Sequence, residues 1–311
     1  MKGIIKRAMI IVVFWGLCLV SYAPGQEAPL DHGLSPLEQE ILYLVNLGRA
    51  KPFLMAEFLG MDVDFLRSVA GEWLPLLEHG MPPVAPDQRL FSASRGHSMD
   101  MLDRLYYSYI TPEGQTPHQR VSSQGYPALV VRERLGLLVL ERFVPAHDAA
   151  MALFRNIFMD ELTPGRFDSP RMFDPSVRDV GIGVEGGLVF LPGVDGEKRA
   201  YVLTCDFAQN LYPSSPVVLG VVFEDCNGDG MFTAGEGLGG VEVVLTRAGG
   251  EELRTRTWAS GGYALPVDGG GFYDMRVSGG EMGDAVEGRL VPVGSDNVVV
   301  DIMLPAGAHC N

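Results

Sequence analysis

Apolar residues recur at helical spacing in three stretches of the first two thirds of the chain. The first stretch begins at Ser35-Pro36, where Ser is a preferred N-cap residue and Pro is tolerated in the first turn. Ile41, Leu44 and Val45 follow at positions i, i+3 and i+4, the period of an amphipathic helix. The same spacing predicts two further helices, over residues 90–106 and 144–159.

Short runs rich in β-branched residues, bounded by turn residues, dominate the rest of the chain and predict strands. In the first part they lie over residues 180–185, 188–191 and 200–207. After a Pro/Ser linker at 211–216 they lie over residues 217–224, 240–246, 254–258, 262–267, 273–277 and 297–304. Successive short strands separated by glycine clusters indicate an all-β sandwich of about ninety residues.

These patterns predict an α+β protein with two domains. Over residues 26–212 helices come first and an antiparallel sheet comes last, which indicates a layered architecture of helices on a sheet. Residues 213–305 are expected to form the small sandwich, and residues 306–311 a short tail. Both parts are long enough to enclose a core of their own.

The N-terminus predicts export. Basic residues within the first seven positions precede an apolar run over 8–20, and Ala23-x-Gly25 follows, which is typical of a signal peptide over residues 1–25. A lipoprotein signal at Cys18 is disfavoured by the bulky Leu17 before it. The apolar run is too short for a membrane-spanning helix, and no later run reaches that length. We therefore expect a secreted protein, extracellular or at the cell surface, without an integral membrane segment after signal removal.

The formal net charge of −15 becomes −18 when the three basic residues of the signal are removed. No cluster of basic residues is present to follow phosphates, so nucleic acid is not an expected partner. The sequence also lacks the Gly-x-Ser-x-Gly, His-Glu-x-x-His and phosphate-loop motifs of common hydrolases and nucleotide-binding enzymes.

An acidic loop lies between the first two strands of the predicted sandwich. Residues 225–236 match the twelve-residue calcium-loop pattern D-x-[DN]-x-[DN]-G-x5-E at every constrained position. Ca²⁺ prefers about six to eight oxygen ligands. The pattern assigns these to Asp225, Asn227, Asp229, the Met231 carbonyl, Thr233 and Glu236. An acidic, glycine-rich turn without an ion is the alternative. Because strands flank the loop, a structural Ca²⁺ is expected rather than a helical calcium sensor.

The predicted sandwich resembles a known family. Residues 220–230, 235–245 and 259–266 together resemble the Cna B/SdrD-type B-repeats of surface proteins. This resemblance implies a calcium-binding β-sandwich that acts as a spacer or adhesin module. Many members of the wider fold form an isopeptide bond from a lysine on the first strand, but no lysine follows Lys198, so that cross-link is excluded.

Three cysteines remain after signal removal, at positions 205, 226 and 310. The first and last strands of such sandwiches commonly lie side by side, and Cys226 and Cys310 follow those strands, so we favour a disulfide between them. Cys205 lies in an apolar strand and is expected to be a buried free thiol. The alternative is that all three thiols are free.

The first domain resembles the bacterial CAP superfamily, the cysteine-rich secretory, antigen and pathogenesis-related proteins. The similar segments are 44–50, 90–101, 107–114, 120–121 and 179–184, in family order, and the resemblance covers residues 35–210. It implies a three-layer α-β-α sandwich with a surface cleft, in which many members hold a divalent metal with two histidines and two glutamates.

This chain departs from the family's metal pattern. Tyr107-Ser108-Tyr109 stands where the family has Phe-Ser-His, so a phenol replaces the first histidine. Arg132-Glu133-Arg134 stands for Gly-Glu-Asn and keeps one glutamate between two cations. The later Gly-His-Arg segment corresponds to Gly165-Arg166 or to residues 168–171, again without histidine. No zinc is therefore expected in the cleft, because a catalytic site needs about three protein ligands and an open position.

His97, Tyr109 and Glu133 remain as candidates for the cleft. A helical histidine in an apolar setting is more often structural than functional. Glu133 is expected to be ion-paired with its neighbouring arginines, with a lowered pKa. His118 and His147 are expected at the surface.

The leading hypothesis is a secreted, non-enzymatic binding or surface protein that recognises a lipid, glycan or protein. The first alternative is a hydrolase or peptidase that acts through the CAP cleft. The second is a structural spacer of an exported assembly. Loss of the family histidines favours binding over metal-dependent chemistry, whereas failure of the first domain to capture any ligand would favour the spacer.

Overall fold

The computed structural model of the chain describes residues 33–163, 171–190, 195–247, 249–250, 252–284 and 286–310. The predicted signal peptide, residues 1–25, and the Gly165-Arg166 segment lie outside the described residues. The α-helices are α1 (Pro36–Ala50), α2 (Pro52–Phe58), α3 (Val63–Val69), α4 (Leu74–His79), α5 (Gln88–Arg104), α6 (Pro117–Ser123) and α7 (Ala146–Glu161). Short 3-10 turns are η1 (Gly71–Trp73), η2 (Gly280–Met282) and η3 (Ala308–Cys310).

The strands of the first part are β1 (Ala85–Pro86), β2 (Ala128–Leu140), β3 (Asp179–Val189) and β4 (Lys198–Asn210). Those of the second part are β5 (Val217–Asp225), β6 (Glu242–Arg247), β7 (Glu252–Arg256), β8 (Gly262–Pro266), β9 (Gly271–Ser278), β10 (Val286–Val293), β11 (Val298–Val299) and β12 (Ile302–Pro305).

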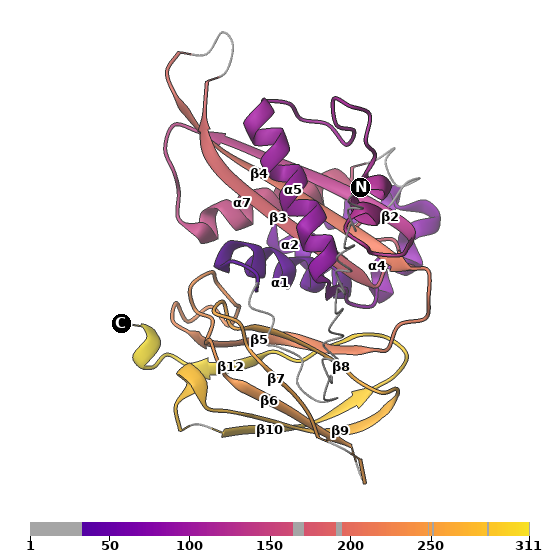
Figure 1. The fold of residues 1–311 in the computed structure, drawn as a ribbon, viewed down its shortest axis with the longest axis vertical. Coiled ribbons are helices and arrows are strands. Elements are labelled where there is room, and N and C mark those ends of the chain that lie inside the picture. The colour runs from indigo at the N-terminus through magenta and orange to yellow at the C-terminus, as the bar shows by residue number, and fades with distance from the viewer. Residues whose placement is uncertain are drawn as a thin grey trace, which may run out of the picture.

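The first part is a three-layer α-β-α sandwich, as predicted. Its sheet has the order β1-β3-β4-β2, antiparallel except for the short parallel pair of β1 with β3. Alternate residues of β3 face opposite layers. Val180 and Ile182 join the core that α1 and α7 form on one side, while Gly181 and Gly183 face α5 on the other (Figure 1).

The two β3 glycines allow α5 to lie directly on the sheet. A Cβ atom on Gly181 would come within 2.2 Å of the Leu90 carbonyl carbon, and one on Gly183 within 2.2 Å of the Arg95 nitrogen. No side chain fits there, so α5 approaches the strands at backbone distance. The serine Ser98 uses this closeness, since its Oγ donates to the Gly183 carbonyl oxygen at 2.9 Å.

Helical periodicity located the long helices correctly. α1 has the predicted Ser35 N-cap, which the structure extends to a capping box with Glu38, and α5 and α7 match the predicted ranges within two residues at either end. The strand order was less well predicted. The sheet does not simply follow the helices, because β2 precedes α7 and supplies one edge. β2 was missed altogether, since the Arg132–Arg134 triplet interrupts its apolar run. The strands predicted over 180–185 and 188–191 form one continuous strand, β3.

The second part consists of two packed sheets. One has the order β10-β9-β6-β7, and the other has the order β11-β5-β12 with β8 paired to β5. Their facing side chains, among them Val243, Tyr263 and Ile302, form a separate buried cluster. Within the described residues, β10 was not predicted from the sequence. Its apolar residues do not all face the core, since Val286 and Leu290 are exposed, and the strand therefore lacks a clear alternation of apolar and polar positions.

A disulfide joins Cys226 to Cys310, as predicted. The expected reason also holds, since β5 and β12 run side by side in parallel with Asp225 opposite Pro305. Cys205 is a free thiol and fully buried. Among the residues that the structure describes, none of the helices combines the length and apolar character needed to cross a bilayer.

The two parts meet along α1, which lies against β5 and the loops beside it (Figure 1). The Trp258 indole N–H donates to Gln39 Oε1 at 3.0 Å, and the Ala234 N–H donates to Glu40 Oε2 at 2.9 Å. The rings of Tyr43 and Phe232 pack edge to face, with centroids 5.9 Å apart. One helix therefore contacts both the first core and the predicted calcium loop.

Candidate functional site

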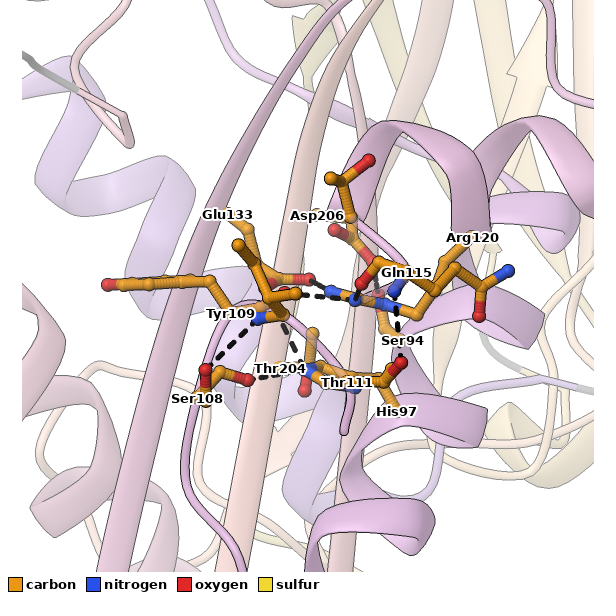
Figure 2. Close-up of polar contacts among 12 residues, drawn as sticks. Ser94, His97, Ser108, Tyr109, Thr111, Gln115, Arg120, Glu133, Thr204 and Asp206 are labelled. Carbon is orange, nitrogen blue, oxygen red and sulfur yellow. Dashed lines mark hydrogen bonds and ion pairs between the residues drawn. The ribbon is translucent and has the colours of Figure 1, made fainter. Parts of the chain in front are cut away.

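Helix α5, the loop after it, α6 and the strands β2 and β4 bring a group of polar side chains together on one side of the sheet (Figure 2). His97 comes from α5, Arg120 from α6, Glu133 from β2 and Asp206 from β4. Glu133 and Asp206 stand directly opposite each other in the β2–β4 pair. All four residues are buried, with relative exposures of 1%, 6%, 4% and 0%.

Arg120 holds this cluster together. Its Nη2 donates to Glu133 Oε2 at 2.5 Å, and its Nη1 donates to the carbonyl oxygens of Tyr109 at 2.9 Å and Gln115 at 3.1 Å (Figure 2). The Thr116 capping box fixes the first turn of α6, which places the guanidinium toward the sheet. A guanidinium with its donors directed at fixed acceptors forms a rigid internal partner for the glutamate.

The expected pairing of Glu133 with its sequence neighbours was wrong. Successive strand residues point to opposite faces of a sheet. Arg134 therefore reaches across the other face to Glu161 and Asp160, while Arg132 pairs with Asp174. The expected lowering of its pKa was wrong as well, because burial and the adjacent Asp206 carboxylate raise the pKa of Glu133 well above its usual range.

Glu133 and Asp206 behave as one coupled acid pair. Glu133 Oε1 and Asp206 Oδ1 are buried and receive no hydrogen bond from any described donor. Burial also raises the pKa of Asp206, although Ser94 Oγ donates to its Oδ2 at 2.8 Å. The two raised pKa values favour a single proton on this pair of carboxyl groups, and Arg120 faces the remaining charge.

His97 is neutral and tied to the backbone. Its Nε2–H donates to the Ser108 carbonyl oxygen at 3.0 Å, and the same nitrogen is 3.9 Å from Glu133 Oε1. Burial and the nearby Arg120 charge lower the pKa of His97 to about 4. The structure thus places His97 next to Glu133, as the cleft hypothesis expected, but with its inward nitrogen occupied.

Tyr109 contributes its backbone rather than its phenol to the cluster. Its carbonyl oxygen accepts from Arg120, whereas its hydroxyl accepts from Arg171, whose guanidinium lies 4.5 Å over the ring. In Figure 2 the ring extends away from Arg120. The three predicted cleft residues are therefore brought together, but through Arg120, which sequence reasoning did not select.

A surface hollow of about 390 Å³ lies over this cluster, with His97 and Arg120 in its wall. The remaining wall is mostly polar and includes Asp100, Thr111, Gln115 and Ser123. Arg104 and Glu113 pair across its rim. Such a hollow offers hydrogen-bond donors and acceptors to a polar ligand.

The residues at this site do not fit the divalent metal of the wider family. The lone pairs of Glu133 face Arg120 and Asp206, the inward nitrogen of His97 donates to a carbonyl, and the Tyr109 phenol is turned toward Arg171. In this part of the described chain, no three His, Cys, Asp or Glu side chains have ligand atoms within 4.8 Å of one another. We therefore derive no chemistry through a metal here.

The predicted calcium loop carries the oxygen-bearing residue types that an oxygen-coordinated cation requires, on a tightly folded backbone. Asn227 Nδ2 lies 2.9 Å from Asp229 Oδ2 and 3.0 Å from Thr233 Oγ1, so three of the predicted ligands converge. Backbone N–H groups of Gly228, Asp229 and Gly230 turn toward the Asp225 carboxylate. Glu236, only 5% exposed, folds back to the loop's start and accepts from Cys226 and Asn227 N–H groups.

The two histidines predicted at the surface, His118 and His147, have different surroundings. His118 is exposed on α6 and its Nε2 donates to the Ala128 carbonyl oxygen. His147 is not a free surface residue, because its Nδ1 lies 2.7 Å from Glu40 Oε1 at the junction of α1 and α7. Its side chain is 41% exposed, and its partner Glu40 in turn accepts the Ala234 N–H of the second part.

A comparison with family models matches residues 42–207 to the CAP, Cysteine-rich secretory protein family, over more than half of the 311 residues. The chain belongs to the CAP family. The matched residues of this CAP domain contain α5, α6, β2 and most of β4, and with them every member of the Arg120 cluster. No curated protein matches the chain.

Two solved structures similar to the chain are an extracellular protein containing an SCP domain from Bacillus anthracis strain Ames and an outer surface protein from Borrelia burgdorferi. The first is 19% identical, with a TM-score of 0.29, and the match covers 42% of this chain and 35% of that one. The second is 12% identical, with a TM-score of 0.28, and the match covers 47% of this chain and 90% of that one. The chain thus spans about a third of the length of the first structure.

Sequence reasoning missed Arg120 and Asp206 as members of the site. Arg120 was noticed only as part of a family segment, and Asp206 only as part of an apolar strand. A charged residue inside an otherwise apolar strand is the available signal, since an aspartate is rarely buried without a partner. The partner of Asp206 is Glu133, and it can be identified only from the pairing of β4 with β2, a strand that the sequence did not predict.

Proposed function

We propose that this chain is an exported, non-enzymatic binding protein whose CAP domain recognises a hydroxyl-rich ligand such as a glycan. The observation that carries the proposal is Arg120, which neutralises the one surviving family glutamate from inside the protein. A buried glutamate that pairs with a guanidinium and lies beside a second carboxyl group supports the structure rather than acting on a substrate.

The polar hollow supports a glycan rather than a lipid. Its wall contains amide, hydroxyl and charged groups, among them Gln115, Gln124 and Thr111. Sugar hydroxyls both donate and accept hydrogen bonds, as these side chains do. A lipid chain gains from packing against large apolar side chains, and no Val, Leu, Ile, Met or Phe lines this hollow.

The test is binding of the mature chain to cell-wall and host glycans by calorimetry, with one blocked variant and one matched control. Ser123 lines the hollow, whereas Ser122 beside it on α6 does not. We expect Ser123→Trp to abolish glycan binding and Ser122→Trp to leave it unchanged. Equal binding by both variants, or capture of lipids or proteins in place of glycans, would contradict the proposal.

A hydrolase acting through the same cleft is the alternative that the 3.9 Å approach of His97 Nε2 to Glu133 Oε1 favours. Turnover of peptides or peptidoglycan by the mature chain, lost in Glu133→Gln, would establish that alternative. If neither binding nor turnover is found, the spacer hypothesis gains.

We also infer that residues 225–236 bind a structural Ca²⁺ and that residues 213–305 form a B-repeat-like module. Asp225, Asn227, Asp229, the Met231 carbonyl, Thr233 and Glu236 would hold the ion, which would supply charge to an otherwise acidic strand junction. The convergence of Asn227, Asp229 and Thr233 supports this inference. So does the position of the loop beside the disulfide, at the ends of β5 and β12.

Export is part of the proposal. The N-terminal pattern supports it, and the Cys226–Cys310 disulfide supports it independently, because disulfides persist in oxidising compartments. An extracellular location also supplies calcium at the concentrations that a weak site requires. Mass spectrometry of the secreted protein should find Gln26 as its first residue.

A further inference from the structure

A second cavity lies at the junction of the two parts, away from the CAP cleft. It has a volume of about 370 Å³ and lies between α1 on one side and β5 and β11 on the other. Leu42, Tyr43 and Leu47 line it from the CAP domain, and Leu219, Val298 and Val299 line it from the sandwich. Most of its wall is apolar, in contrast to the polar hollow over Arg120.

The walls of this junction cavity are fixed by hydrogen bonds from both sides. Asn46 on α1 exchanges two hydrogen bonds with the Val84 backbone, at 3.1 and 2.9 Å. Asn297 donates to the carbonyl oxygens of Pro83 at 3.1 Å and Arg178 at 2.8 Å. Both asparagines are buried and both line the cavity. The space is thus preformed, as small-molecule sites usually are.

One carboxylate stands in this apolar wall. Asp301 Oδ1 accepts the Val221 N–H at 3.0 Å. The charge of Arg289 partly offsets the effect of burial on the pKa of Asp301, but among the described residues no cation forms an ion pair with this carboxylate. Burial raises the pKa of Asp301 to about 6, so the group is ionised at neutral pH. An ionised carboxylate in an apolar wall is costly unless a cation or several donors face it.

We propose that the junction cavity binds a small amphiphile whose protonated amine pairs with Asp301 and whose apolar body packs against α1 and β11. The carboxylate supplies the charge complement, and Leu42, Leu47 and Val299 supply the apolar contact. This site is independent of the CAP cleft and of the calcium loop, so its failure would leave the function proposed above untouched.

The test is calorimetric titration of the full mature chain with decylamine, decanol and decanoate, each below its micelle concentration. The three probes share one chain length and differ in charge. We expect saturable one-to-one binding of decylamine, binding of decanol about tenfold weaker, and no binding of decanoate, because a hydrogen-bonded charge pair adds roughly a factor of ten or more.

Three variants locate the binding. Asp301→Asn keeps an acceptor for the Val221 N–H but removes the charge, and should weaken decylamine about tenfold while leaving decanol unchanged. Val299→Trp fills the cavity from the edge strand and should abolish both. Asp274→Asn removes an exposed carboxylate on β9 and is the matched control, expected to bind as the original chain does.

Circular dichroism of each variant establishes that it is folded. The proposal is overturned if decylamine and decanoate bind equally, if no probe saturates, or if Val299→Trp binds decylamine undiminished. It is also overturned if Asp301→Asn and Asp274→Asn lose affinity equally, because the amine would then be responding to net charge rather than to the cavity.

Discussion

At the scale of single residues, this protein depends on one arginine between two buried acids. Arg120 forms a short ion pair with Glu133, and burial beside the Asp206 carboxylate raises the pKa of Glu133. Removing one member of a buried charge pair leaves the other unpaired, at a cost of about 3–5 kcal/mol.

We predict that Arg120→Ala lowers the free energy of unfolding by about 3–5 kcal/mol. Arg132→Ala is the matched control, because Arg132 lies next to Glu133 on β2 but forms a partly exposed ion pair with Asp174, and should cost no more than about 1 kcal/mol. Urea denaturation followed by circular dichroism measures both. Equal losses in the two variants would mean that Arg120 is not the central contact.

His97 gives the stability a defined dependence on pH. Its pKa is about 4 in the folded chain and about 6.5 when unfolded, so the unfolded state binds more protons between these values. Above pH 6.5 both states are neutral and the group contributes no dependence. As the pH falls from about 6.5 to 4, stability should drop by roughly 3 kcal/mol from this group alone. The variant His97→Gln should lose most of this decrease in the free energy of unfolding between about pH 6.5 and 4. An unchanged decrease would contradict the assignment of the pH dependence to His97.

At the scale of elements, the loop with the calcium-binding sequence pattern, residues 225–236, begins at the end of β5. Its side chains and backbone N–H groups already turn inward, and the disulfide holds the start of the loop to the C-terminal segment. Binding to the folded state alone stabilises by RT ln(1 + [L]/Kd), which is about 2.7 kcal/mol at a hundredfold excess over Kd.

We therefore predict that millimolar calcium raises the melting temperature of the mature chain relative to chelator. Glu236→Gln should remove most of that rise, because the loop pattern assigns it the bidentate position. Glu252→Gln on exposed β7 should retain it. Differential scanning calorimetry in chelator and in calcium tests this, and superimposable curves for the original chain would refute the calcium site.

At the scale of the whole molecule, α1 couples the CAP domain to the sandwich. Trp258 packs against the first core, its indole donates to Gln39, and it lies so close to Gly33 that a Cβ there would come within 2.3 Å. The two parts should therefore unfold in a single transition, since contacts shared across the junction make their unfolding cooperative.

Truncating this contact in Trp258→Ala should cost about 2–4 kcal/mol and divide the calorimetric transition into two. The same truncation within the first part, Trp73→Ala, is the matched control. It should lower the melting temperature and keep a single transition, because Trp73 packs only within the first part. One transition in both variants would show that other junction contacts suffice.

The sequence by itself determined the features that depend on local pattern. The capped start of α1, the helical stripe of α5 and the oxygen residues of loop 225–236 are all set by neighbours a few positions apart. The Cys226–Cys310 pairing was within reach because it followed from a resemblance that placed the first and last strands together.

Only the tertiary structure decided which charges meet. Glu133 has arginines on both sides in the sequence, yet strand alternation turns them away and α6 delivers Arg120 instead. Asp206 reaches Glu133 only through the β2–β4 register, and the junction cavity exists only because α1 and β11 come from different parts of the chain. The physical reason is common to all three cases: long-range contacts are chosen by packing and by the energy of buried charge, which no local spacing encodes.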